Sequence, residues 1–151
     1  LRSRCSTDEI AGIYIGGGDT VKLLREIRAV GFDSYLHEVA LKGIPLYGGS
    51  AGAIILGEDI RTAPEASQLG ETETVGLRII KGYSIFCHYK AEDFRSVVKL
   101  SDELRKHIIA ISEKAGGYIT GGMFTNYGTE PVVIIRDGKV DTVNPNYSIE
   151  L

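Results

Sequence analysis

Short apolar runs alternate with amphipathic stretches along the first half of the chain, and this alternation is typical of βα units. A buried strand is predicted from Ile10 to Ile15, where apolar and β-branched residues precede a run of glycines. A helix should follow, capped by Asp19 or Thr20 and stopped by Gly31. The apolar stripe expected on this helix consists of Leu23, Leu24, Ile27 and Val30.

The same pattern continues to about residue 56. A second helix is predicted from Asp33 to Lys42, and a second strand from Ile44 to Tyr47. The inward positions expected on the second helix are Leu36, Val39 and Ala40. A glycine-rich turn and a helix of small and apolar residues, ending near Leu56, come next. The stretch from Gly57 to Gly82 is polar and mixed, and we expect surface loops there.

The second half is richer in predicted strands. Strands are expected at Tyr83 to Cys87, His107 to Ser112, Gly117 to Thr120, Glu130 to Ile135 and Val140 to Val143, with helices at Glu92 to Leu100 and Ser101 to Lys106. A turn at residues 136–139 should close a hairpin. Together these elements predict a single domain over residues 1–151, an α/β three-layer sandwich with a mostly parallel sheet.

Composition narrows the class of function. The formal charge is −3 and 43% of residues are hydrophobic, so the chain can build a core and offers no basic surface for nucleic acid. No apolar run reaches the roughly 20 residues that a membrane-spanning helix needs, and residues 1–5 lack the apolar region of a signal peptide. We therefore expect a cytoplasmic protein. Its 2 cysteines form no Cys-x-x-Cys pair, so a structural zinc is not expected. We expect no cofactor.

Ser50 stands in the sequence Gly-x-Ser-x-Gly, between a predicted strand and a predicted helix. This arrangement presents a serine nucleophile on a tight elbow, where glycines leave room around a strained serine backbone. The amide of Ala51, at the start of the helix, would point to the position of an oxyanion. Close packing of a glycine-rich turn is the alternative explanation of the same pattern.

Two further strand ends carry groups that complete a catalytic triad. His88 follows the strand that ends at Cys87, and Glu113 follows the next strand. Functional groups collect at the carboxyl ends of parallel strands, so Ser50, His88 and Glu113 are the predicted nucleophile, base and orienting acid. Gly18 is the predicted second oxyanion donor. The substitutes considered for the acid are Glu130 and Asp102.

Other polar residues have simpler interpretations. His37 and His107 are expected to be surface or packing residues, and Cys87 a buried structural thiol. The turn from Gly16 to Asp19 resembles a phosphate-binding loop, but no lysine follows it as in a P-loop. Cations available to bind a substrate carboxylate are Arg61, Lys90 and Arg95.

The blocks Ile13-Tyr14-Ile15-Gly16-Gly17-Gly18-Asp19-Thr20, Gly48-Gly49-Ser50-Ala51-Gly52-Ala53 and Phe86-Cys87-His88-Tyr89 resemble the peptidase E (α-aspartyl dipeptidase) family, which is related to cyanophycinase. The resemblance implies a flavodoxin-like fold of the class I glutamine-amidotransferase type. It also implies a metal-independent Ser-His-Glu or Ser-His-Asp triad that cleaves short peptides after an N-terminal aspartate. Ser50 and His88 take the nucleophile and base positions, and Glu113 matches the acid.

Two departures from that family affect what we expect. Asp19 stands where the family usually has asparagine, and a negative charge there would oppose an aspartyl substrate unless it is protonated or turned away. Family members begin with βα units ahead of the strand at Ile10, which this chain apparently lacks. The leading hypothesis is a serine peptidase that acts on small peptides. Its partner is a small peptide substrate, and a homodimer is considered as an alternative to the monomer. The alternative is a non-catalytic amidotransferase-like binding or scaffold domain.

Overall fold

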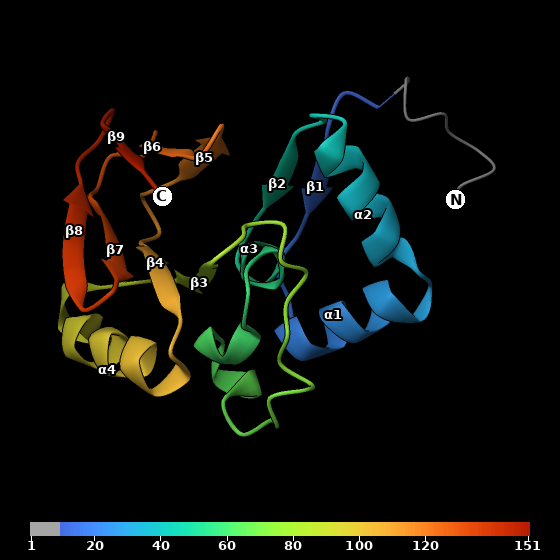
Figure 1. Ribbon diagram of the computed structural model, residues 1–151, viewed down its shortest axis with the longest axis horizontal. Helices are drawn as coiled ribbons and strands as arrows, with labels where there is room; N and C mark the ends of the chain where they lie inside the picture. Colours follow the sequence, from blue (N-terminus) through green and yellow to red (C-terminus); the bar gives the residue numbers. More distant parts are fainter. Residues whose placement is uncertain (1–9) are drawn as a thin grey trace. The chain divides into compact units, whose positions relative to one another are not determined.

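The computed structural model describes residues 10–151, so Cys5 lies outside the described residues. The chain forms two compact units (Figure 1). The first unit ends at Lys81, and the second unit is Gly82–Leu151. Helices and strands are mixed in both units, which confirms the predicted α/β class.

The first unit contains a parallel pair of strands joined by two helices. Strand β1 (Ile13–Ile15) pairs with β2 (Leu46–Gly48), and helices α1 (Thr20–Ala29) and α2 (Phe32–Leu41) connect them. Helix α3 (Ala51–Leu56) follows β2 after two residues. A parallel pair needs a crossover of this length, because the chain must return to the same end of the sheet. The predicted order of elements is confirmed.

Apolar side chains of these elements form the core of the first unit. The largest buried ones are Ile15, Leu24, Ile27, Leu36, Val39, Ile54, Ile55 and Leu56. The predicted inward positions of α1 and α2 are thus largely correct, but Val30 is 76% exposed. The helical repeat predicts that Val30 faces inward, but Val30 is the C-cap of α1 and lies beyond its last helical residue. Its side chain therefore does not continue the apolar stripe.

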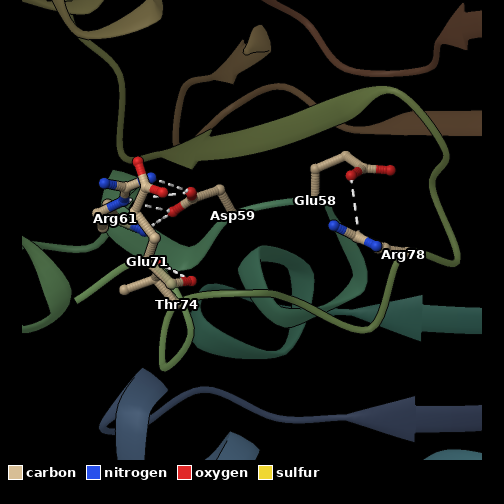
Figure 2. A network of polar contacts seen from close by, with 6 residues as sticks. All are labelled: Glu58, Asp59, Arg61, Glu71, Thr74 and Arg78. Carbon is tan, nitrogen blue, oxygen red and sulfur yellow. Dashed lines mark hydrogen bonds and ion pairs between the residues drawn. The ribbon is translucent and has the colours of Figure 1, made fainter. Parts of the chain in front are cut away.

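The segment between α3 and the second unit contains only two short 3₁₀ turns, η2 (Ile60–Thr62) and η3 (Pro64–Ala66). The prediction of loops is confirmed, but the segment is not confined to the surface, because Ile60, Ala63, Ala66 and Leu77 are buried. The segment is nevertheless held by specific contacts: the Leu77 amide donates to Ile55 O at 2.6 Å and the Ile60 amide donates to Thr74 O at 2.8 Å. Polar side chains add a second set of contacts around Asp59 and Arg61 (Figure 2).

The second unit contains a four-stranded sheet in the order β3-β4-β7-β8. Its elements are β3 (Tyr83–Cys87), η4 (Ala91–Asp93), α4 (Phe94–Leu104), β4 (His107–Ile111), β7 (Val132–Arg136) and β8 (Lys139–Val143). Strands β3 and β4 are parallel, and α4 connects them. Val97 of α4 packs with Ile108 and Ala110 of β4 and with Val133 and Ile135 of β7 in a buried cluster.

A smaller antiparallel sheet, in the order β5-β6-β9, completes the second unit. It consists of β5 (Gly117–Thr120), β6 (Met123–Asn126) and β9 (Ser148–Glu150). The sequence analysis predicted β5 but not the other two strands. Both are short, and Phe124 of β6 is buried between Ile119 and Ile149, which become its neighbours only after the sheet has formed.

Two predictions for the second half need correction. The helices predicted on either side of residue 100 are one helix, α4, since no residue between them breaks the helical backbone. The expectation of a mostly parallel sheet does not describe the second unit, where β7 pairs antiparallel with both β4 and β8. The tight turn at Asp137 and Gly138, both with positive φ, requires antiparallel pairing of β7 and β8. Within residues 10–151, none of the helices has the length and apolar character needed to span a membrane.

Candidate active site

Ser50 lies at the junction of β2 and α3 and is the N-cap residue of α3, with φ 51° and ψ −119°. A positive φ is costly for a residue with a side chain, and such strain costs about 1–3 kcal/mol. The Ser50 side chain makes no capping hydrogen bond to α3. The backbone at Ser50 is therefore a strained strand-to-helix turn and differs from that of an ordinary serine N-cap.

Glycines are required on both sides of Ser50 because the backbone segments approach closely. A Cβ atom on Gly48 would lie 2.6 Å from the Ala53 Cα, and a Cβ on Gly52 would lie 2.0 Å from the Ile15 carbonyl oxygen. Both distances are shorter than any van der Waals contact, and the obstructing atoms belong to the backbone. The predicted reason for the glycines, an elbow too tight for side chains, is confirmed at these two positions.

The turn that follows β1 runs beside Ser50. A Cβ on Gly17 would lie 3.3 Å from the Ser50 Cβ and 3.8 Å from its Oγ. The Gly49 amide donates to the Ile15 carbonyl at 3.0 Å, which joins the ends of β1 and β2. Gly18 has φ 140°, a conformation that favours glycine. Ala51 is the first residue of α3, so its amide is among those that lack an acceptor within the helix.

The first turn of α1 is occupied by two carboxylates of the chain itself. Asp19 is the N-cap residue, and its Oδ1 accepts from the Lys22 amide at 2.8 Å. Glu65, 45 residues further on, accepts from the Thr20 amide at 2.8 Å. The Thr20 backbone N–H lowers the pKa of the Glu65 carboxyl. These contacts disfavour the phosphate-loop interpretation, because carboxylates already fill the positions that a phosphate would take.

His88 and Glu113 are brought together at the carboxyl ends of two adjacent parallel strands. Cys87 of β3 is in register with Ile111 of β4, and each functional residue follows its strand directly or after one further residue. The His88 Nδ1 contacts the Glu113 Oε1. The side chains are 56% and 74% exposed, respectively. His88 has φ 61°, a left-handed turn at the point where the chain leaves the sheet.

The two substitutes for the acid have other surroundings. Glu130 accepts from the Ser112 hydroxyl at 2.6 Å and lies 3.3 Å from the Lys114 ammonium. The hydrogen bonds from Ser112 and Lys114 lower the pKa of Glu130. Asp102 is part of helix α4. Of the three carboxylates considered, Glu113 is the one for which the structure gives a contact with His88.

The Cys87 thiol is poorly suited to be a nucleophile. Burial, with a smaller contribution from the charge of Glu113, raises its pKa to about 12. A thiol with this pKa stays protonated at neutral pH, which disfavours Cys87 as a nucleophile, although the residue is half-buried rather than fully buried as predicted. His107, at the opposite end of β4, pairs with Asp137 at 3.1 Å. Within residues 10–151, no cluster of three or more His, Cys, Asp or Glu side chains is arranged to hold a metal ion.

The three cations considered for binding a substrate carboxylate have different surroundings. Figure 2 shows the Arg61 guanidinium facing Asp59, which it contacts through Nε at 3.0 Å and Nη2 at 2.6 Å. Asp59 is only 4% exposed, and its hydrogen bonds raise the pKa of Arg61, with a further contribution from the charges of Asp59 and Glu71. Arg61 therefore has a structural role. Lys90 and Arg95 are exposed.

The predicted site residues are distributed over the two units. Ser50 with the adjacent glycine turns belongs to the first unit, and His88 with Glu113 to the second. Glu65 was missed, because no pattern around Pro64 and Glu65 indicates a contact with a helix 45 residues earlier.

Comparison with curated proteins gives two kinds of relative. Peptidase E of Shewanella oneidensis is 35% identical over 78 residues, which is 52% of this chain and 33% of that protein. Pyridoxal 5'-phosphate synthase subunit PdxT of Fervidobacterium nodosum is 33% identical over 67 residues, 44% of this chain and 35% of that protein. The matches thus span about a third of the length of each relative.

Two solved structures share the fold. A peptidase from an acI-B1 actinobacterium aligns with a TM-score of 0.67 and 20% identity over 96% of this chain. A candidate peptidase E from Listeria monocytogenes aligns with a TM-score of 0.55 and 23% identity over 91% of this chain. In both cases the alignment covers 61% of the solved chain. The model of peptidase family S51 matches residues 5–140, which cover most of each unit and include Ser50, His88 and Glu113. The chain therefore belongs to peptidase family S51.

Proposed function

We propose that the chain is a serine peptidase that hydrolyses short peptides, with Ser50 as nucleophile, His88 as general base and Glu113 as the residue that orients His88. The observation that carries this proposal is the backbone of Ser50, a serine with φ 51° between β2 and α3. The contact between His88 and Glu113 and the membership of family S51 support it. We also propose the flavodoxin-like arrangement, supported by the helical crossovers between parallel strands.

The chemistry follows from the orientation of His88. Because Nδ1 faces Glu113, this nitrogen carries a hydrogen atom and donates a hydrogen bond to the carboxylate, which leaves Nε2 unprotonated as the base. Nε2 accepts the Ser50 hydroxyl proton as Oγ attacks the peptide carbonyl carbon. The resulting imidazolium is stabilised by Glu113 and then protonates the leaving amine. Water, activated by the same nitrogen, releases the acyl group from Ser50.

The negative charge on the tetrahedral carbonyl oxygen needs hydrogen-bond donors. We assign this role to the amides of Gly18 and Ala51. The turn that contains Gly18 runs beside Ser50, and Ala51 is the first residue of α3. Loss of one such donor typically costs roughly 3 kcal/mol of transition-state stabilisation.

Hydrolysis of a dipeptide panel by the purified chain tests the proposal. The panel contains Asp-Leu, Ala-Leu and β-Asp-Arg, because the resemblance to peptidase E implies a preference for N-terminal aspartate. Ser50→Ala should lower kcat by on the order of 10⁴-fold or more, and Glu113→Gln by about 10²–10⁴-fold. A serine-directed phosphonate should label the wild type at Ser50.

His107→Gln is a matched control, since it disrupts a second histidine–carboxylate pair, that of His107 at the start of β4 with Asp137. Its activity should equal that of the wild type. Full hydrolysis by Ser50→Ala would refute the proposal. Absence of both hydrolysis and labelling, in a folded wild-type chain, would favour the non-catalytic binding or scaffold domain.

A further inference from the structure

We propose that Glu65 is a positioning residue, which fixes the turn from Gly16 to Asp19 beside Ser50 by holding the Thr20 amide. The proposal rests on the proposed function, since that function places an oxyanion donor, Gly18, in this turn. Glu65 lies far from the turn in sequence, in the segment that follows α3.

The three glycines of this turn have no side chains that could fix its shape, and the Asp19 side chain holds only the end that joins α1. Residues 16–18 are all glycine, and a Cβ on Gly18 would meet no atom within 4 Å. Glycine also has the largest conformational freedom of any residue, so fixing it is entropically costly. The direction of the Gly18 amide therefore depends on how firmly the two ends of the turn are held.

The end nearest β1 is fixed by the sheet. The Ile15 carbonyl accepts from the Gly49 amide at 3.0 Å, and Ile15 is in register with Gly48 of β2. The other end is Thr20, which is 1% exposed and starts α1. Its amide donates to Glu65 Oε1 at 2.8 Å. A hydrogen bond to a charged acceptor is stronger than one between neutral groups, so Glu65 is an effective anchor.

The segment that carries Glu65 is held in place by other contacts within the first unit. Arg61 holds the buried Asp59 a few residues earlier (Figure 2). The Arg28 Nη2 of α1 donates to the Val75 carbonyl at 2.7 Å. The Glu65 carboxylate is therefore presented from a supported backbone.

A purely structural role for Glu65 predicts a different outcome from a positioning role. Asp19 already caps α1 through the Lys22 amide, so loss of Glu65 leaves the helix one of its two carboxylate contacts. A structural role would reduce stability without a specific effect on kcat. A positioning role predicts greater freedom of the Thr20 amide and a lower kcat at similar KM, because the oxyanion donor acts in the transition state.

Amide hydrogen exchange and steady-state kinetics on the purified chain test the proposal. Glu65→Ala should speed exchange of the Thr20 amide roughly tenfold or more, since the bond to a charged group is lost. It should lower kcat about 10-fold to 100-fold with KM nearly unchanged, as expected for a small displacement of a catalytic donor. Glu65→Gln keeps an acceptor oxygen and should restore most of both.

Glu73→Ala is the matched control. Glu73 lies in the same segment and contacts the same helix, through Arg25 at 3.0 Å, but it does not contact the turn. It should leave Thr20 exchange and kcat unchanged. If Glu65→Ala does not fold, Glu65→Asp, whose side chain is too short to reach Thr20, takes its place.

Unchanged Thr20 exchange in Glu65→Ala would overturn the proposal, as would equal losses of kcat in Glu65→Ala and Glu73→Ala. The exchange measurement does not depend on activity. A wild-type chain without hydrolysis or phosphonate labelling would refute the proposed function, while exchange would still decide whether Glu65 fixes the turn.

Discussion

Replacing Gly52 by alanine should destabilise the first unit by about 2–4 kcal/mol, because α3 and β1 approach each other too closely for a side chain. The added methyl group would lie 2.0 Å from the Ile15 carbonyl oxygen and 2.9 Å from that of Gly16. Neither atom belongs to a flexible side chain. Ile15 is paired with Gly48 in the sheet, and its carbonyl accepts from the Gly49 amide at 3.0 Å.

The expected loss of stability has two contributions, overpacking and a weakened hydrogen bond. Overpacking of a filled interior costs typically about 1–3 kcal/mol. Moving the Ile15 carbonyl away weakens its hydrogen bond to Gly49, which contributes about 1 kcal/mol. For a chain of 151 residues, a total of about 2–4 kcal/mol corresponds to a fall in Tm of roughly 4–16 °C.

Urea unfolding of the wild type and the variant, followed by circular dichroism, measures the difference. Gly70→Ala is the control, because a Cβ there would meet no atom within 4 Å. This control should be unchanged or stabilised by at most about 1 kcal/mol. A Gly52→Ala chain as stable as the wild type would show that α3 does not approach β1 as described, and the explanation of the elbow by close packing would be wrong.

Three further predictions follow from the polar contacts. Asp19→Ala should lower the free energy of unfolding in urea by about 1 kcal/mol, because the Lys22 amide loses its hydrogen-bond acceptor, and Asp19→Asn should lower it much less. Equal losses in the two variants would contradict the capping role of Asp19. Burial raises the pKa of Cys87 to about 12, so its alkylation by iodoacetamide at pH 8 should be at least about 100-fold slower in the native chain than in urea. Peptide mass mapping follows the reaction. Fast labelling of the native chain would contradict the burial of this thiol. Because the Thr20 amide lowers the pKa of Glu65, the wild type should have a larger free energy of unfolding than Glu65→Gln near neutral pH, and this difference should disappear as pH falls below about 4. A difference that persists in acid would show that the hydrogen bond from Thr20 does not cause the shift.

The elements with strong local signals were predictable from the sequence. The strand at Tyr83–Cys87 was predicted with the observed bounds, because a mainly apolar run, interrupted by Ser84, lies between Gly82 and His88. Asp19 or Thr20 was predicted to cap the first helix, and Asp19 is the cap, because its side chain reaches the amide three residues later. The contact of His88 with Glu113 followed from the rule that neighbouring parallel strands end at the same edge of a sheet.

Features that depend on distant parts of the chain were not predictable in this way. The burial of Phe124 depends on the register of β5, β6 and β9, which local propensity does not determine. The hydrogen bond from Thr20 to Glu65 joins residues 45 positions apart, and Glu65 follows a proline in a polar loop. A carboxylate in such a loop is usually solvated, so the sequence gives no reason to assign it to a helix terminus.

The same first turn of α1 bears on the substrate preference implied by the resemblance to peptidase E. A carboxylate at position 19, where the family usually has asparagine, would oppose an aspartyl substrate if its charge faced the substrate. The Asp19 Oδ1 instead accepts from the Lys22 amide, at the positive end of the dipole of α1. An asparagine oxygen could accept from the same amide, so the two residues are equivalent as caps. Because the charge of Asp19 is offset by its own helix, its presence is compatible with aspartyl peptides, and Asp-Leu belongs in the first panel of substrates.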